Sequence, residues 1–183
     1  MKTPMSQTRF SLGVVAVDGK VYAIGGFTNS GYLDLNEQYD LVTDTWTTLT
    51  SMPTPRNDFA IVACQGKIYC MGGITSNGNS WFKCGVNEVY DVVTDSWSTK
   101  ASLPFNGSGV TAHAADGKIF VLNARTLYMY DPSADSWTEK TSMPTIIMSR
   151  LSFVLTTATG DKFMVIGEFQ NARSSNAEAE PNL

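Results

Sequence analysis

The residues that could support catalysis are sparse in this sequence. His113 is the single histidine, and it lies in an apolar stretch where a packed strand residue is the simpler interpretation. Cys64, Cys70 and Cys84 lack the spacing of a metal site. No glycine-rich phosphate loop and no pair of a nucleophile with a base stands out. The residues therefore point to binding rather than catalysis, and neither a metal nor a cofactor is expected.

Arginines recur at one position relative to a turn. Arg9, Arg56 and Arg150 each stand ten residues before a turn glycine. Such an arginine can contact a partner at the surface, or it can bond backbone carbonyls and join neighbouring repeats. Two aromatic residues, Trp81 and Phe82, lie in the longest loop. They can anchor a partner or fold back onto the chain's own surface, and both interpretations stay open.

Four apolar hairpins must position these residues. Each has two short strands around a tight turn, and a glycine pair follows the second strand in the first two copies. Such a pair predicts a left-handed backbone or a crowded centre. The third copy has Asn123-Ala124 instead, and the fourth has Glu168 in place of the second glycine. The hairpins cover residues 17–26, 64–73, 115–124 and 160–168.

A second pattern follows the first three hairpins. Each of these hairpins is followed by a Tyr-Asp pair, and a tryptophan stands seven residues after each tyrosine, at Trp46, Trp97 and Trp137. Four strands in each repeat of about 40–50 residues, without a helix pattern, predict radially arranged four-stranded sheets. We expect the tryptophan to fill the wedge between sheets. The aspartate after the tyrosine should accept backbone N–H bonds in the following turn.

Composition limits the classes of partner. The 183 residues are 43% apolar and 16% charged, which favours a folded chain, and the net charge of −4 gives no reason to bind nucleic acid or an anionic membrane. No apolar run approaches the roughly 18–20 residues of a membrane helix, and no signal peptide is expected. We expect reduced, buried cysteines in a cytoplasmic protein, although a bridge between Cys64 and Cys70 is conceivable.

The recurring set of residues resembles the kelch repeat. In the second unit the set comprises Gly66-Lys67-Ile68-Tyr69, Gly72-Gly73, Tyr90-Asp91, Thr94-Asp95, Trp97 and Pro104. The Met-Pro-x-x-Arg segment at 52–56 resembles the animal kelch-like proteins in particular. The resemblance covers roughly residues 5–168. It implies a β-propeller that acts as a protein-interaction platform and that has more blades than this chain contains.

The expected fold is all-β: an incomplete kelch β-propeller of three four-stranded antiparallel blades plus the inner hairpin of a fourth. A fragment of a longer protein is the interpretation we favour. Two chains that complete one ring, or a degenerate product, are the alternatives. The expected segments are a lead at 1–8, blades at 9–50, 51–101 and 102–141, a partial blade at 142–168 and a disordered tail at 169–183.

The resemblance implies a ligand site on the rim around the central channel. In kelch-like propellers this rim combines the residues that lead into the innermost strand with the loop after the double glycine. No tight binding of an acidic peptide is expected, because the positions where some relatives carry arginine hold Ser11, Asp58, Gly109 and Ser152. The expected partner-binding residues are Arg9, Ser11, Asn29, Tyr32, Arg56, Asn57, Asp58, Trp81, Phe82, Ser108, Arg150 and Ser152.

The expected function is therefore the binding of a protein or peptide, without enzymatic activity. The resemblance implies a fragment of a substrate-recognition subunit for a cullin-3 ubiquitin ligase, although the BTB and BACK domains common in such proteins are not visible here. The copper site of galactose oxidase relatives needs two histidines, which this chain lacks. A metal-independent sugar epimerase that uses Glu and Arg, and an actin-associated scaffold, remain alternatives.

Overall fold

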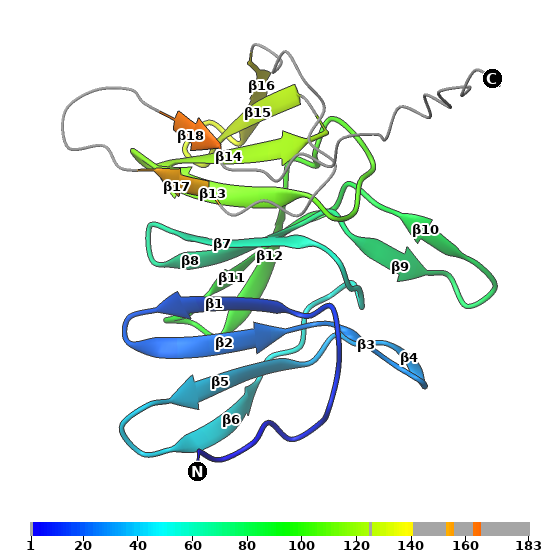
Figure 1. Ribbon diagram of the computed structural model, residues 1–183, viewed down its shortest axis with the longest axis vertical. Coiled ribbons are helices and arrows are strands. Elements are labelled where there is room, and N and C mark those ends of the chain that lie inside the picture. The colour runs from blue at the N-terminus through cyan, green and yellow to red at the C-terminus, as the bar shows by residue number, and fades with distance from the viewer. Residues whose placement is uncertain (1, 125, 141–152, 156–162, 166–183) are drawn as a thin grey trace, which may run out of the picture.

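The computed structural model describes residues 2–124, 126–140, 153–155 and 163–165. Within these ranges the chain is all-β and contains no helix (Figure 1). Three four-stranded antiparallel sheets account for most of the strands, and three two-stranded sheets account for the rest. Of the expected partial blade at 142–168 only 153–155 and 163–165 are described, and the expected tail at 169–183 and the residues Arg150 and Ser152 lie outside the described residues.

Each four-stranded sheet is one blade. Its four strands follow chain order from the innermost to the outermost, and the short two-stranded hairpins described below are not part of the sheet. Blade 1 consists of β1 (Gly13–Val17), β2 (Lys20–Ile24), β5 (Asn36–Asp40) and β6 (Thr45–Leu49). Blade 2 consists of β7 (Ala60–Cys64), β8 (Lys67–Met71), β11 (Asn87–Asp91) and β12 (Ser96–Lys100). Blade 3 consists of β13 (Thr111–Ala115), β14 (Lys118–Asn123), β15 (Thr126–Asp131) and β16 (Ser136–Glu139). The fourth hairpin pairs β17 (Phe153–Leu155) with β18 (Phe163–Val165), so the expected architecture is confirmed.

The tight turns of the inner hairpins follow from two consecutive left-handed residues. In blade 2, Gln65 has φ 52° and Gly66 has φ 70°. Blades 1 and 3 repeat this with Asp18 before Gly19 and Asp116 before Gly117. Two left-handed residues in a two-residue loop give the turn whose twist matches that of antiparallel strands. The turn thereby sets the register of the whole inner pair.

The glycine pair ends the second strand where two blades meet. Gly72 has φ 69°, and a Cβ on it would lie 2.7 Å from the carbonyl oxygen of Gly107, which leads into blade 3. The N–H of Gly73 donates to that same oxygen over 2.7 Å. In blade 1, Gly26 donates to the carbonyl of Arg56 over 3.0 Å. The missing side chains thus let the backbones of adjacent blades touch.

The third strand begins later than expected in blades 1 and 2. The sequence pattern predicts third strands at 33–39 and 86–90, but β5 begins at Asn36 and β11 at Asn87. In blade 1 the preceding residues bond the glycine pair instead: Gly25 donates to Leu35 over 2.8 Å, and Leu33 donates to Gly26 over 2.9 Å. The same residues also bond the segment that crosses to blade 2: Met52 donates to Asp34 over 2.8 Å, and Arg56 donates to Leu33 over 3.1 Å.

Two side hairpins follow the glycine pairs of blades 1 and 2. The first pairs β3 (Phe27–Thr28) with β4 (Gly31–Tyr32), and the second pairs β9 (Ile74–Ser76) with β10 (Trp81–Lys83). Both project from the same side of the molecule, on the right in Figure 1. Blade 3 has lost its glycine pair, and there β14 extends to Asn123, which pairs directly with Thr126. No side hairpin separates these two strands.

The core consists of two apolar clusters between adjacent blades. The first joins Ile24 of blade 1 to Ile68 of blade 2, and the second joins Met71 of blade 2 to Ile119 of blade 3. All four of these side chains are fully buried. Trp97 packs against the first cluster and Trp137 against the second. The expected role of these tryptophans in the wedge between blades is therefore confirmed.

The three cysteines are free and buried. Cys64 belongs to the cluster with blade 3, whereas Cys70 belongs to the cluster with blade 1. The two thiols thus lie on opposite faces of blade 2, which rules out the bridge between them. Burial raises the pKa of the Cys70 thiol to about 12, so this thiol stays protonated and packs as a small apolar group.

Candidate functional site

The lead-ins, which are the residues before the innermost strands of blades 1 and 2, pair with the side hairpins of the same blades and form one surface with them. Phe10 precedes β1 and bridges to Phe27 of β3, where its N–H donates to the Phe27 carbonyl over 3.1 Å. Asn57 precedes β7 and bridges to Ile74 of β9 over 3.0 Å in the same way. Backbone pairing therefore fixes each side hairpin against the lead-in of its own blade.

Exposed aromatic side chains mark this surface. Trp81 is 68% exposed and Phe82 is 45% exposed on β10, so neither folds back fully onto the blade. Phe10 is 55% exposed, and its ring lies 5.3 Å from that of Phe27, which in turn lies 4.9 Å from Tyr32. Phe10 and Phe27 were not among the expected site residues. The glycine pair directly before Phe27 was the available signal, because it places the next side chain on the rim.

Arg9 and Arg56 lie inside their blades rather than on the rim. The Arg56 guanidinium bonds the Glu88 carboxylate and donates to the Cys70 carbonyl over 2.8 Å, and its side chain has no exposed surface. Arg9 bonds Glu37 at 2.8 Å and three carbonyls of blade 1, at Ala23, Gly25 and Leu35. Their burial leaves no guanidinium surface for a partner. The carbonyls lie in each arginine's own blade, which corrects the expectation that they join two blades.

Blade 3 replaces this buried ion pair by aromatic packing. The position of Arg56 is taken by Gly107, and the position of Glu88 by Tyr128. The Phe105 ring lies 5.0 Å from the Tyr128 ring, and a Cβ on Gly107 would lie 2.8 Å from Phe105. The aromatic pair thus fills the space that an arginine side chain occupies in blades 1 and 2.

A chain of backbone hydrogen bonds crosses the lead-ins. The N–H of Asp58 donates to the Ser11 carbonyl over 3.0 Å, and the N–H of Gly109 donates to the Asp58 carbonyl over 2.9 Å. All three residues are left-handed, with φ of 52°, 54° and 66°. Ser11, Asn57, Asp58 and Ser108 are half-buried along this path, Tyr32 is half-buried on β4, and Asn29 is exposed at its turn. Backbone hydrogen bonds therefore join the lead-ins of the three blades into one path, whereas Arg9 and Arg56 lie inside their blades.

A repeated clamp holds the segment that crosses from one blade to the next. In blade 2 the Tyr90 hydroxyl donates to Asp95 over 2.6 Å. Asp95 accepts the N–H of Thr50 over 2.9 Å, and the Trp97 indole donates to the Thr50 carbonyl over 2.8 Å. One residue is thus bound through both of its backbone groups. We call this arrangement the Tyr-Asp-Trp clamp.

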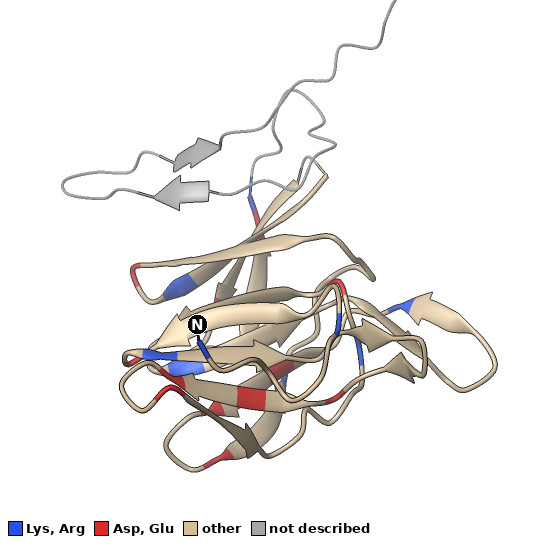
Figure 2. Ribbon diagram, turned by 60° about the horizontal axis from the view of Figure 1, so that its bottom comes forward, with Lys and Arg blue, Asp and Glu red and all other residues tan. Residues whose placement is uncertain are grey.

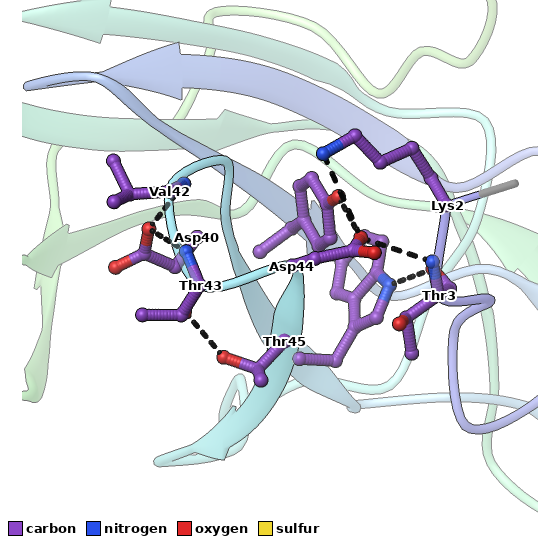
Figure 3. Close-up of polar contacts among 9 residues, drawn as sticks. Lys2, Thr3, Asp40, Val42, Thr43, Asp44 and Thr45 are labelled. Atoms are coloured by element: carbon purple, nitrogen blue, oxygen red, sulfur yellow. Dashed lines mark hydrogen bonds and ion pairs between the residues drawn. The ribbon is translucent and has the colours of Figure 1, made fainter.

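The clamp recurs in the other two blades. In blade 3, Asp135 and Trp137 hold both backbone groups of Ala101, at 2.8 and 2.9 Å. In blade 1 the residue held is Thr3: Asp44 accepts its N–H over 3.0 Å, and the tryptophan of β6 donates to its carbonyl over 2.9 Å (Figure 3). The N-terminal lead is therefore fixed in the place of a crossing segment.

Each blade also carries a lysine–aspartate pair on the side opposite the side hairpins. The pairs are Lys20 with Asp40 at 2.6 Å, Lys67 with Asp91, and Lys118 with Asp131 at 2.6 Å. The aspartates accept N–H groups of the turn, at Val42, Val93 and Ser133, as expected from the sequence. In Figure 2 the basic and the acidic residues are interspersed along the ribbon rather than gathered in areas of one sign.

The turn aspartates should make folding sensitive to acid. The hydrogen bond from Lys20, with those from the turn N–H groups, lowers the pKa of Asp40 to about 2. The Tyr39 hydroxyl lowers the pKa of Asp44, the aspartate of the clamp. Lysine or tyrosine donors also lower the pKa of the equivalent aspartates in the other two blades, which are Asp91, Asp95, Asp131 and Asp135.

We expect the urea midpoint of unfolding to fall as the pH drops from about 4 to about 2. A lowered folded-state pKa adds stability that is complete above the unfolded-state pKa and is lost as the pH falls through the folded-state value. Lys20→Met should move this loss to higher pH by raising the pKa of Asp40, whereas Lys83→Met on β10 should leave it in place. A midpoint that stays constant between pH 4 and pH 2 would contradict this.

Other kinds of site receive little support from the described residues. In the described part of the chain, no group of three or more His, Cys, Asp or Glu side chains could hold a metal ion. Across those same residues, no helix has the length and apolar character needed to cross a membrane. A hollow of about 160 Å³ lies against blade 2, where Lys67 and Asp91 in its lining pair with each other. It is smaller than the roughly 300 Å³ of ordinary ligand pockets.

Known proteins share both the sequence pattern and the fold. The kelch motif matches residues 8–53 and 55–104. Kelch-like protein 35 of Mus musculus is 28% identical over 147 residues, which cover 79% of this chain and 25% of that protein. Kelch-like protein 33 of Homo sapiens is 40% identical over 52 residues, which cover 28% and 10%. The Influenza virus NS1A-binding protein homolog of Xenopus laevis is 43% identical over 54 residues, which cover 30% and 8%.

The solved structure of YjhT resembles this chain with a TM-score of 0.74 at 19% identity, covering 91% of this chain and 59% of that one. At this identity the likeness concerns the fold. The chain spans a quarter or less of the length of the curated relatives above. Two kelch motifs nevertheless cover more than half of the chain, and the three blades repeat the same clamp and core. The chain therefore belongs to the kelch-repeat family, and its described part is an incomplete kelch β-propeller.

Proposed function

We propose that this chain is a non-enzymatic interaction module that binds a protein or peptide on the rim formed by the side hairpins and the lead-ins. The observation that carries the proposal is the exposure of Trp81 and Phe82 on β10. Large aromatic side chains supply most of the binding energy when they enter a partner's pocket. Phe10 and Tyr32 extend the same side of the molecule over blade 1.

The charges of the site favour a neutral or apolar ligand segment. Glu37 and Glu88 neutralise the arginines inside the blades, and Asp58 places a carboxylate on the rim. An acidic peptide would meet no free guanidinium from Arg9 or Arg56. Tight binding of an acidic peptide that is unchanged in Asp58→Ala would overturn this preference.

The finer proposal is that the module recognises substrates for a cullin-3 ubiquitin ligase in the cytoplasm. The resemblance to kelch-like proteins supports it, as do the two matches that carry that name. Three free cysteines fit a reducing compartment. A second copy of the chain is also a candidate partner, on a different surface that is treated below.

We expect Trp81→Ala and Phe82→Ala each to weaken partner binding at least tenfold. The ligand would be a peptide selected on the full chain from a random library, and fluorescence anisotropy would measure its affinity. Val93→Ala is the matched control, because Val93 is 88% exposed but lies in the turn between β11 and β12. The proposal fails if both aromatic variants bind as tightly as the Val93 variant does.

A further inference from the structure

Blade 1 has an outward face that is built like an interface between blades. We define this face by Leu12, Val14, Ala16, Val21 and Leu41. Val14 is 56% exposed and Leu41 is 53% exposed. The repeat places Ile61 and Val92 of blade 2 at the positions of Val14 and Leu41, and both pack into the cluster between blades 1 and 2. The same type of side chain is thus covered in one blade and uncovered in the other.

The equivalence extends across the whole face. Phe59 and Ile68 of blade 2 occupy the positions of Leu12 and Val21, and they are 8% and 0% exposed. Leu12 and Val21 themselves are only half-buried, and Ala16 is exposed. Apolar residues on a strand face cost free energy when they meet water, and such a face in a folded protein marks an interaction surface.

The clamp of blade 1 is an independent observation. The clamps of blades 2 and 3 hold Thr50 and Ala101, which directly follow the outermost strands β6 and β12 of the preceding blades. Blade 1 holds Thr3 through the same two bonds. Its partner residue is therefore placed as though an outermost strand stood before it, beside the outward face.

The backbone chain along the lead-ins is open at the same end. Asp58 and Gly109 each donate an N–H to the lead-in of the preceding blade. Ser11 has the same left-handed conformation, with φ 52°, but its N–H donates to no acceptor within the described residues. The apolar face, the clamp that holds Thr3 and the N–H of Ser11 thus all lie on the same side of blade 1.

We propose that the outward face of blade 1 docks a kelch blade of a second copy of this chain. Within the described residues, the corresponding faces of blades 2 and 3 pack against the preceding kelch blade, and a second copy of this chain can present such a blade. The chain covers 59% of the solved YjhT chain, so two copies together contain enough chain for a propeller of that length. The contact joins unlike faces of the two copies, as every blade contact in this fold does.

Sedimentation velocity of the full 183-residue chain between about 1 and about 100 µM tests the proposal. We expect a mass that rises from one chain to two over this range. Hydrogen exchange at both concentrations should show added protection in β1 at the higher one, with β12 unchanged. A wild-type chain that stays monomeric at about 100 µM overturns the proposal.

Charge substitutions locate the contact. Val14→Lys and Leu41→Lys should each raise the dissociation constant of the dimer at least tenfold, because each would bury an unpaired charge. Val93→Lys is the control, since it makes the same change at a residue 88% exposed in the turn of blade 2. Leu41 lies in a turn, so its variant keeps the test decisive if Val14→Lys disrupts β1. A dimer that survives Leu41→Lys as well as it survives Val93→Lys overturns the proposal. Failure of the dimer proposal would not affect the proposed peptide binding, because the peptide assay tests Trp81 and Phe82 instead.

Discussion

Replacing Arg56 with methionine should lower the free energy of unfolding by about 3–5 kcal/mol. The arginine has no exposed surface, and its partner carboxylate on Glu88 is 3% exposed. Without the guanidinium, that carboxylate keeps the Thr54 hydroxyl at 2.7 Å but loses its countercharge. A buried charge without a partner costs far more than the net value of the ion pair itself. Equilibrium unfolding in urea at pH 7 measures the loss.

Blade 3 supplies the matched control for this substitution. At the positions of Thr54, Arg56 and Glu88 it carries Phe105, Gly107 and Tyr128. The triple variant T54F/R56G/E88Y therefore transplants a packing solution that already works in this protein. Apolar replacement of a whole buried ion pair is often close to neutral, so we expect a loss below about 1.5 kcal/mol. If the single and the triple variant lose the same free energy of unfolding, the cost of Arg56→Met arises from altered packing rather than from an unpaired carboxylate.

The blade architecture was predictable because its signals are local and repeat. A turn such as Gln65-Gly66 sets one hairpin on its own, and the interval from Tyr90 to Trp97 sets the outer pair. Three copies in register then make the assignment independent of any single residue. Strand ends were less predictable, because Leu33 and Leu35 look like strand residues and yet bond the glycine pair.

The burial of the arginines was harder to predict because its cause is the pairing of distant residues. Arg56 alone fits a binding rim as well as an interior. The informative pattern is that arginine and glutamate occur together: Arg9 with Glu37, and Arg56 with Glu88, whereas blade 3 lacks both. Two positions that change together between repeats indicate contact. No comparable sequence pattern indicates the exposure of Trp81 on its hairpin, because an aromatic residue in a loop has the same sequence context whether it is packed or exposed.

Gly72→Ala should destabilise the protein by about 1–3 kcal/mol more than Gly66→Ala. The two glycines have nearly the same backbone conformation, with φ of 69° and 70°. Each alanine therefore carries a similar left-handed strain of about 1–2 kcal/mol. Only Gly72 adds a steric term, since its Cβ would lie 2.7 Å from the Gly107 carbonyl oxygen, whereas nothing lies within 4 Å of a Cβ on Gly66.

The difference between the two variants isolates the contact between blades from the conformational cost. The Gly107 oxygen cannot move away freely, because it accepts the N–H of Gly73 over 2.7 Å. Blade 3 as a whole must shift to admit the methyl group, which loosens the cluster around Met71 and Ile119. Urea unfolding should therefore show a lower midpoint for Gly72→Ala, and hydrogen exchange should show faster opening of β13 and β14 in that variant only. If both alanine variants lose the same free energy, the glycine pair serves the turn of its own strand and not the packing of one blade on the next.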